Sequence, residues 1–171
     1  WGMHRDDLRE ELRSRLGGNS FGASDDFSEQ LYFYALRCTQ RDAPRSRRML
    51  EVGCGPGWGL DMISRLEESS SFVGLDLSPK AIEFANKRSS NSQRLKFMQG
   101  DAEALPFGDA EFDVVLNIES SHNYPHPEKF FAEAVRVLKP GGYLVHADMM
   151  TPSLRAQVAS IRNDLGHAVE W

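Results

Sequence analysis

The sequence predicts a single α/β domain in which helices cover both faces of a doubly wound, mostly parallel sheet. From Met49 onward, short apolar runs alternate with helical stretches, as in repeated strand–helix–strand units. A glycine-rich loop follows the first of these runs, at the place where such folds bind ligands. The length of 171 residues matches one domain with one core, and therefore one site.

Composition excludes several classes of protein. The chain is 40% hydrophobic and 26% charged, which is typical of a globular protein in water. No apolar run approaches the roughly 20 residues that cross a bilayer, and the charged N-terminal stretch is unlike a secretory signal. A formal net charge of -5 gives no general attraction to nucleic acid. We therefore predict a cytoplasmic protein without a membrane span or a nucleic-acid partner, whose two cysteines, Cys38 and Cys54, are reduced.

Two amphipathic helices are predicted before the sheet. In the first, leucines recur every fourth residue, at Leu8, Leu12 and Leu16. Residues 27–37 predict a second helix with an aromatic cluster. We predict that residues 1–44 form a helical lid or substrate cap, and that the leucine stripe allows a homodimer.

Five strands and three intervening helices are predicted after this cap. The strands are the apolar runs 49–53, 71–77, 95–101, 112–119 and 142–149. The helices lie near 57–67, 79–89 and 127–138, with a short helical turn at 102–105. The second helix opens with a serine cap and a proline, and the third closes with Lys-Pro-Gly-Gly.

The C-terminal part of the predicted sheet has an uncovered edge. After one more helical pattern at 154–165 the sequence stops, whereas parallel sheets are normally covered. We therefore expect residues 45–171 to form a ligand-binding core from which the C-terminal strands are missing.

The stretch LEVGCGPGWGLD places glycines at four alternate positions, which are Gly53, Gly55, Gly57 and Gly59. Glycines let the main chain approach a ligand closely, and the N–H groups that begin the next helix favour a negative group. A dinucleotide fingerprint would need a third glycine where Trp58 stands, and no Lys-Ser/Thr pair follows as in a nucleoside triphosphate loop. Both phosphate-binding interpretations are therefore disfavoured.

Two acids follow neighbouring strands at the same rim. Asp76 ends the second predicted strand, where a carboxylate can accept hydrogen bonds from both hydroxyls of a ribose. Asp101 ends the third, where it can accept from an adenine amine with the Ala102 backbone at the ring edge. Together with the glycine loop, these residues outline a site shaped for adenosine.

Five segments in order, EVGCGPG, GLDLS, GDAEALPF, FDVV and RVLKPGGYL, resemble the successive motifs of class I S-adenosylmethionine-dependent methyltransferases. The resemblance covers roughly Met49–Met149 and implies the Rossmann-like fold of that family. It also implies S-adenosyl-L-methionine as cofactor, with S-adenosyl-L-homocysteine as product. No metal is expected, because Asp148 is followed by Met149 rather than Asn, and Asn117 stands where a hard cation would prefer a carboxylate. Carried over residue by residue, the resemblance assigns to the cofactor Glu51, Gly53, Gly55, Gly57, Asp76, Leu77, Asp101, Ala102 and Asn117, with Glu51 ordering the loop from behind.

The ends of the fourth and fifth predicted strands supply candidate catalytic residues. Methyl transfer is an in-line displacement, so a base is needed only where the nucleophile carries a proton. Histidine changes charge near neutral pH, so His122 can accept such a proton, and Asp148 can orient its ring. The other two histidines of this region, His126 and His146, are predicted to be structural.

ESSHNYPH and GGYLVHAD narrow the resemblance to natural-product O-methyltransferases, of the phthiotriol and phenolphthiotriol dimycocerosate and sugar types. That resemblance implies that His122 and Asp148 deprotonate an acceptor hydroxyl. The predicted function is O-methylation of a small-molecule natural product, which is a polyketide, a glycoside or a lipid-like acceptor. Two alternatives stay open: a C-methyltransferase of the sterol or quinone type, which would use Glu119 and Tyr124 to stabilise a cation, and a non-catalytic cofactor-binding subunit.

Overall fold

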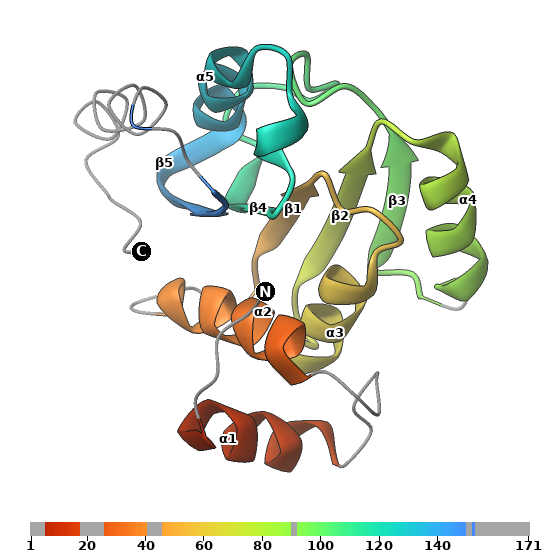
Figure 1. Ribbon diagram of the computed structural model, residues 1–171, viewed down its shortest axis with the longest axis vertical. Helices are drawn as coiled ribbons and strands as arrows, with labels where there is room; N and C mark the ends of the chain where they lie inside the picture. Colours follow the sequence, from red (N-terminus) through yellow and green to blue (C-terminus); the bar gives the residue numbers. More distant parts are fainter. Residues whose placement is uncertain (1–5, 18–25, 41–45, 90–91, 150–151, 153–171) are drawn as a thin grey trace.

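The computed structural model describes residues 6–17, 26–40, 46–89, 92–149 and 152 (Figure 1). Five parallel strands in this part of the chain form one sheet, in the order β3-β2-β1-β4-β5. They are β1 (Arg48–Val52), β2 (Ser71–Asp76), β3 (Leu95–Gln99), β4 (Phe112–Ile118) and β5 (Leu138–Ala147). The strand order reverses between β1 and β4, which confirms the doubly wound fold and places the ligand crevice at their carboxyl ends.

Two apolar clusters show which helices cover which face of the sheet. One cluster contains Phe33, Leu60 and Ile82, so it joins the N-terminal helices, α3 and α4 to the face that carries Met49. The other contains Phe130 and joins α5 to the opposite face (Figure 1). The helices are α1 (Asp6–Leu16), α2 (Asp26–Cys38), α3 (Trp58–Leu66), α4 (Pro79–Arg88) and α5 (Pro127–Val137), with a short 3-10 helix, η1 (Ser121–Asn123).

The N-terminal helices pack on the same core as the sheet. Leu8 and Leu12 of α1 are only 2% and 3% exposed, and Phe33 and Leu36 of α2 are fully buried. The leucine stripe therefore lies inside the molecule and is not a free surface for a dimer. The assignment of residues 1–44 as a substrate cap stays a prediction.

The predicted elements agree with the structure to within a few residues, with one clear difference at β5. This strand begins at Leu138 and includes the Lys-Pro-Gly-Gly segment, which was expected to precede it. Phe112 pairs with Leu138, but Val114 then pairs with Tyr143, so the segment forms an irregularity in the ladder. The expected turn at 102–105 contains a single bridge between Asp101 and Ala104, and the 154–165 pattern lies outside the described residues.

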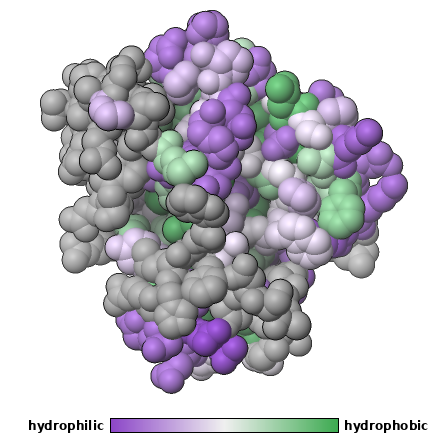
Figure 2. All heavy atoms as spheres, in the orientation of Figure 1, coloured by the Kyte–Doolittle hydropathy of each residue, from purple (hydrophilic) through white to green (hydrophobic). Residues whose placement is uncertain are grey.

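Few large apolar side chains are exposed among the described residues. None of the helices described there is long and apolar enough to cross a membrane. On the face seen in Figure 2, hydrophilic atoms surround smaller apolar groups. The large apolar side chains that are exposed in the described part of the chain are Trp58, Leu77, Phe84 and Met149.

Candidate functional site

The glycine loop joins the end of β1 to the start of α3 and is held by backbone hydrogen bonds to β2. The N–H groups of Gly53 and Cys54 both donate to the Leu75 carbonyl, at 2.8 and 3.1 Å. The loop then turns back on itself, because the Gly57 N–H donates to the Cys54 carbonyl at 2.9 Å. Gly53, Gly55 and Gly57 all have positive φ, a conformation that favours glycine. The backbone conformation of the loop therefore explains why glycine occupies these three positions.

The four glycines leave room for different neighbours. A Cβ atom at Gly55 would meet nothing within 4 Å, so this position opens onto free space. At Gly57 a Cβ atom would lie 2.4 Å from the Phe97 ring, and at Gly59 it would lie 2.0 Å from the Tyr32 ring. A Cβ atom at Gly53 would likewise clash with the Ser120 side chain. Of the four glycines only Gly55 opens onto free space, so the expectation that all four open the main chain to a ligand is wrong, and Gly59 makes room for a side chain of α2.

Asp76 ties the glycine loop to the start of α4. Its Oδ2 accepts from the Gly55 N–H at 2.8 Å, and its Oδ1 accepts from the Ser78 N–H at 2.8 Å. Each carboxylate oxygen has two lone pairs, so each keeps one site for a further donor. The predicted ribose acid therefore lies at the pocket rim with acceptor capacity left on both oxygens.

A pocket lies over the carboxyl ends of β1, β2 and β3. Asp101 holds the turn that follows it, because its Oδ1 accepts from the Glu103 N–H at 2.8 Å. Ala102 is buried, while Leu77 is 70% exposed and offers an apolar surface at the rim. The pocket is lined by Gly53, Leu75, Asp76, Leu77, Gly100, Asp101, Ala102, Glu103, Ser120, Asn123, Tyr124 and Pro125.

Glu51 lies behind the glycine loop and does not line this pocket. It is 0% exposed, and its Oε1 accepts from the Tyr32 hydroxyl at 2.5 Å. Burial raises the pKa of Glu51 to about 8, although the hydrogen bond from Tyr32 opposes the rise, and the negative charge of Asp76 adds to it. Near neutral pH the group is therefore a neutral acid that contacts α2, not the loop that it was expected to order.

Asn117 also lies behind the pocket wall, where it holds two pocket-lining hydroxyls. Its Nδ2 lies 2.7 Å from the Ser120 Oγ, 2.9 Å from the Tyr124 hydroxyl and 2.9 Å from the Val52 carbonyl. Asn117 itself is 0% exposed. Asn117 therefore orders the pocket wall beside Gly53 from behind. It does not reach the pocket surface, although it was predicted to bind the cofactor.

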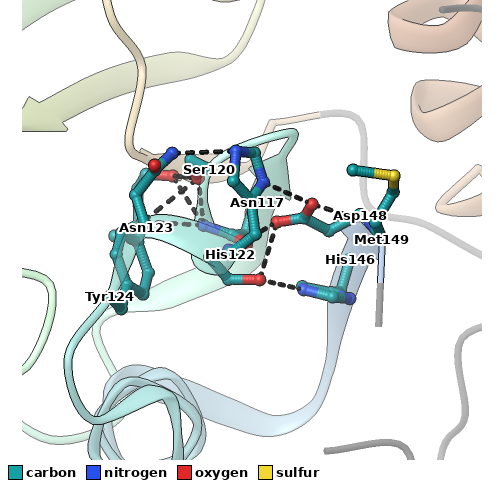
Figure 3. Close-up of polar contacts among 10 residues, drawn as sticks. Asn117, Ser120, His122, Asn123, Tyr124, His146, Asp148 and Met149 are labelled. Atoms are coloured by element: carbon teal, nitrogen blue, oxygen red, sulfur yellow. Dashed lines mark hydrogen bonds and ion pairs between the residues drawn. The ribbon is translucent and has the colours of Figure 1, made fainter. Parts of the chain in front are cut away.

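The proposed dyad is formed in the structure. The chain leaves β4 through Glu119, which has a positive φ of 51°, and enters η1, so that His122 faces Asp148 just beyond β5. His122 Nδ1 lies 2.7 Å from Asp148 Oδ1 (Figure 3). On the other side of the ring, His122 Nε2 lies 2.9 Å from the Asn123 Nδ2, so the dyad is joined to a residue that lines the pocket.

Asp148 is buried but carries enough hydrogen bonds to stay ionised. Its side chain is 0% exposed, and burial alone would raise its pKa. Hydrogen bonds from the His122 ring, the Ser121 hydroxyl and the N–H groups of His122 and Met149 outweigh burial and hold the pKa of Asp148 below its ordinary value. An ionised carboxylate only accepts, so His122 Nδ1 carries the ring proton and Nε2 presents its lone pair to the Asn123 amide.

Three contributors to the site were not predicted as such. Tyr32 of α2 reaches Glu51, and Ser121 of η1 joins Asp148 to His146 at 2.8 and 2.7 Å. A signal for His146 was present, because residues two apart on a strand share a face and His146 precedes Asp148 by two. No local pattern pointed to Tyr32.

The polar groups in and beside the pocket fit S-adenosylmethionine. Gly55 does not line the pocket but opens onto free space next to Asp76, Asp76 keeps two acceptor sites, and Asp101 Oδ2 has no partner within the described ranges. These groups would hold the amino-acid end, the ribose and the adenine amine respectively. The apolar Leu77 and Ala102 would lie against the base.

Comparisons with known proteins agree with this geometry. A sequence model of the family described as methyltransferase domain matches residues 50–146. The phthiotriol/phenolphthiotriol dimycocerosates methyltransferase of Mycobacterium leprae is 50% identical over 103 residues, which are 60% of this chain and 38% of that protein. The fatty-acid O-methyltransferase of Mycolicibacterium smegmatis is 42% identical over 125 residues, 71% of this chain and 45% of that protein. The chain spans less than half the length of these relatives.

Solved structures share the fold. A SAM-dependent methyltransferase of Methanosarcina mazei has a TM-score of 0.51 and 27% identity, covering 60% of this chain and 52% of that one. The cyclase SpnF has a TM-score of 0.61 and 26% identity, covering 81% and 55%. Because a cyclase shares the fold, the fold alone does not decide the reaction. The family match, however, covers more than half of the chain and holds the glycine loop, Asp76 and Asp101, so the chain belongs to the methyltransferase domain family, with S-adenosylmethionine as its cofactor.

Proposed function

We propose that the chain is the core of an O-methyltransferase that transfers a methyl group to a hydroxyl of a lipid-like natural product. The observation that carries the proposal is a histidine that is held by an ionised aspartate with a buried side chain and that contacts Asn123, a residue of the pocket wall. The names of two relatives, a dimycocerosates methyltransferase and a fatty-acid O-methyltransferase, support a lipid-like acceptor.

S-adenosylmethionine supplies a methyl group on a positively charged sulfur. As the acceptor oxygen bonds to the methyl carbon and the carbon–sulfur bond breaks, the hydroxyl proton passes to His122 Nε2. Asp148 keeps the Nδ1–H of His122 in place and stabilises the imidazolium that forms. The His122 side chain is 37% exposed, so the proton can then leave to water.

The geometry favours oxygen over carbon as the nucleophile. A C-methyltransferase would need acidic and aromatic groups around the acceptor, and Tyr124 does line the pocket. Neither Glu119 nor His122 lines the pocket, but His122 Nε2 lies 2.9 Å from the pocket-lining Asn123, whereas Glu119 is exposed with no such side-chain contact among the described residues. A hydroxyl nucleophile loses its proton from oxygen as the methyl group is transferred, and His122 Nε2 offers the base that accepts it.

The test compares His122→Gln with His126→Gln on two sets of acceptors, long-chain alcohols and fatty acids of the same chain length. A fatty acid is already ionised near neutral pH and needs no base, whereas an alcohol does. We expect His122→Gln to lower kcat for alcohols by about 100-fold or more. Turnover of fatty acids, where present, should be unchanged.

His126→Gln is the matched control, because His126 is an exposed histidine four positions along the chain whose ring Nδ1 lies 3.5 Å from the Glu128 carboxylate, and the substitution keeps the backbone hydrogen bond to Glu103. It should behave as the wild type. Full alcohol turnover by His122→Gln would overturn the role of the base. Calorimetric binding of S-adenosylhomocysteine without turnover of any acceptor would instead favour the cofactor-binding subunit.

A further inference from the structure

Two buried residues continue the hydrogen bonds of the dyad into the sheet. The Ser121 Oγ lies 2.8 Å from Asp148 Oδ2 and 2.7 Å from His146 Nε2. Ser121 is 1% exposed and His146 is 3% exposed, so neither is a surface group. The contacts of Ser121 connect His146 to Asp148, which in turn meets His122; these last three residues are labelled in Figure 3.

We propose that Ser121 and His146 are positioning residues for the reaction, which fix Asp148 Oδ2 so that Oδ1 meets the His122 ring. The inference rests on the proposed function, in which His122 is the base. It gives a role in the reaction to His146, which was predicted to be structural.

The position of each proton in this chain follows from simple counting. Ionised Asp148 can only accept, so the single proton of the Ser121 hydroxyl points to Asp148 Oδ2. The Ser121 oxygen must then accept from His146, which therefore carries its proton on Nε2. Burial lowers the pKa of His146 to about 4, against the opposing charge of Asp148, so near neutral pH its ring is neutral and has one N–H to give.

His146 is a buried side chain of the sheet that contacts the short η1 segment through Ser121. It lies within β5 beside Asn117 of β4, and its ring packs edge-on against Phe131 of α5 with the centroids 5.1 Å apart. By contrast, η1 has three residues, and no side chain caps its start. A fixed donor in the sheet thus sets the rotamer of Ser121, and through it the orientation of the carboxylate that holds the base.

The test replaces the donor at each step. His146→Leu fills a similar volume without an N–H, whereas His146→Gln keeps an amide N–H close to the position of the histidine Nε2. Ser121→Ala removes the hydroxyl that links His146 to Asp148. With alcohol acceptors, we expect His146→Leu and Ser121→Ala to lower kcat by about 10-fold at unchanged KM, and His146→Gln to restore most of it.

A second measurement separates positioning from general damage. In ¹⁵N-histidine spectra at neutral pH, the wild type and His146→Gln should show His122 with its proton on Nδ1, whereas Ser121→Ala and His146→Leu should show a mixture of tautomers. Calorimetric affinity for S-adenosylhomocysteine should be unchanged in every variant, because neither residue lines the pocket.

Wild-type kcat and an unchanged Nδ1–H tautomer in Ser121→Ala and His146→Leu would overturn the inference, even where His122→Gln is inactive. Full alcohol turnover by His122→Gln would overturn the proposed function instead. The tautomer of His122 in Ser121→Ala and His146→Leu would still show whether these residues position Asp148. Should His146→Leu fail to fold, Ser121→Ala and His146→Gln carry the test alone.

Discussion

Glu51 and Asp148 lie at the carboxyl ends of two strands of one sheet, each against a ring side chain, yet the structure gives them opposite charge states. Both carboxyl groups are removed from solvent, with exposed fractions of 0%. Burial raises the pKa of Glu51 to about 8, whereas the pKa of Asp148 is held below its ordinary value. Burial by itself therefore does not explain the charge of either group.

The difference is the number of hydrogen-bond donors that each acid meets. Glu51 accepts from Tyr32 alone, and its Oε2 has no partner in the part of the chain that the structure describes. Asp148 accepts from two side chains and two backbone N–H groups. Donors stabilise the charged form and burial opposes it, so a buried acid becomes a fixed anion only where enough donors converge.

The largest effect that this comparison predicts is on the pH dependence of stability, and Glu51→Gln tests it. Because the pKa of Glu51 is about 8 in the folded protein, against an ordinary value of 4.5, its contribution to stability is complete below 4.5 and is lost as pH rises through 8. Each pKa unit is worth about 1.4 kcal/mol, so wild type should lose on the order of 4 kcal/mol relative to Glu51→Gln. Urea unfolding of both proteins between about pH 5 and pH 9 measures this difference.

A control for Glu51→Gln is Glu68→Gln, which changes an exposed glutamate. Its free energy of unfolding should follow the wild-type curve across the whole pH range. Parallel curves for wild type and Glu51→Gln would mean that Glu51 is ionised in the folded protein, and the contrast with Asp148 would be lost.

Asp148→Asn tests the other acid, because it removes the negative charge that the converging donors stabilise. The asparagine keeps the shape of the side chain, but it removes the charge and turns an amide N–H toward groups that already donate. We expect kcat with alcohol acceptors to fall by about 100-fold, because the imidazolium loses its counter-charge. The affinity for S-adenosylhomocysteine should hold, since Asp148 does not line the pocket.

Asp109→Asn is a suitable control for the lost charge, because the Asp109 side chain is 80% exposed and pairs with Arg136 away from the pocket. This variant should keep wild-type kcat. Equal losses in Asp109→Asn and Asp148→Asn would mean that general destabilisation, rather than the dyad, explains the fall.

Most of the fold could be predicted because its signals are local. Apolar runs set the strands, and the cap and proline at Ser78 and Pro79 set the start of α4, where the structure has them. The start of β5 could not be placed in this way, because the irregularity before Tyr143 is a property of its pairing with β4. Strand register depends on a partner that is distant in the sequence.

In the site, Gly53, Asp76 and Asp101 follow directly from strand ends and line the pocket, whereas Gly55 and Gly57 do not, and the roles of all five stay predictions. The contacts that set charge and orientation were missed. Tyr32 meets Glu51 across 19 positions, and Ser121 meets His146 across 25. Such contacts depend on how helices pack on the sheet, and no spacing within one element encodes them.

The smallest effect predicted from the comparison is that of Tyr32→Phe, which removes the donor to Glu51 and keeps the ring that packs against Gly59. Near neutral pH the lost hydrogen bond should cost about 1 kcal/mol of unfolding free energy. Because that hydrogen bond lowers the pKa of Glu51, its removal should also move the pH-dependent loss of stability to higher pH. Ser121→Ala, by contrast, leaves Asp148 with three donors, so its stability curve should keep the wild-type pH dependence near neutral pH. A larger shift in Ser121→Ala than in Tyr32→Phe would show that the number of donors does not set the charge of these two acids.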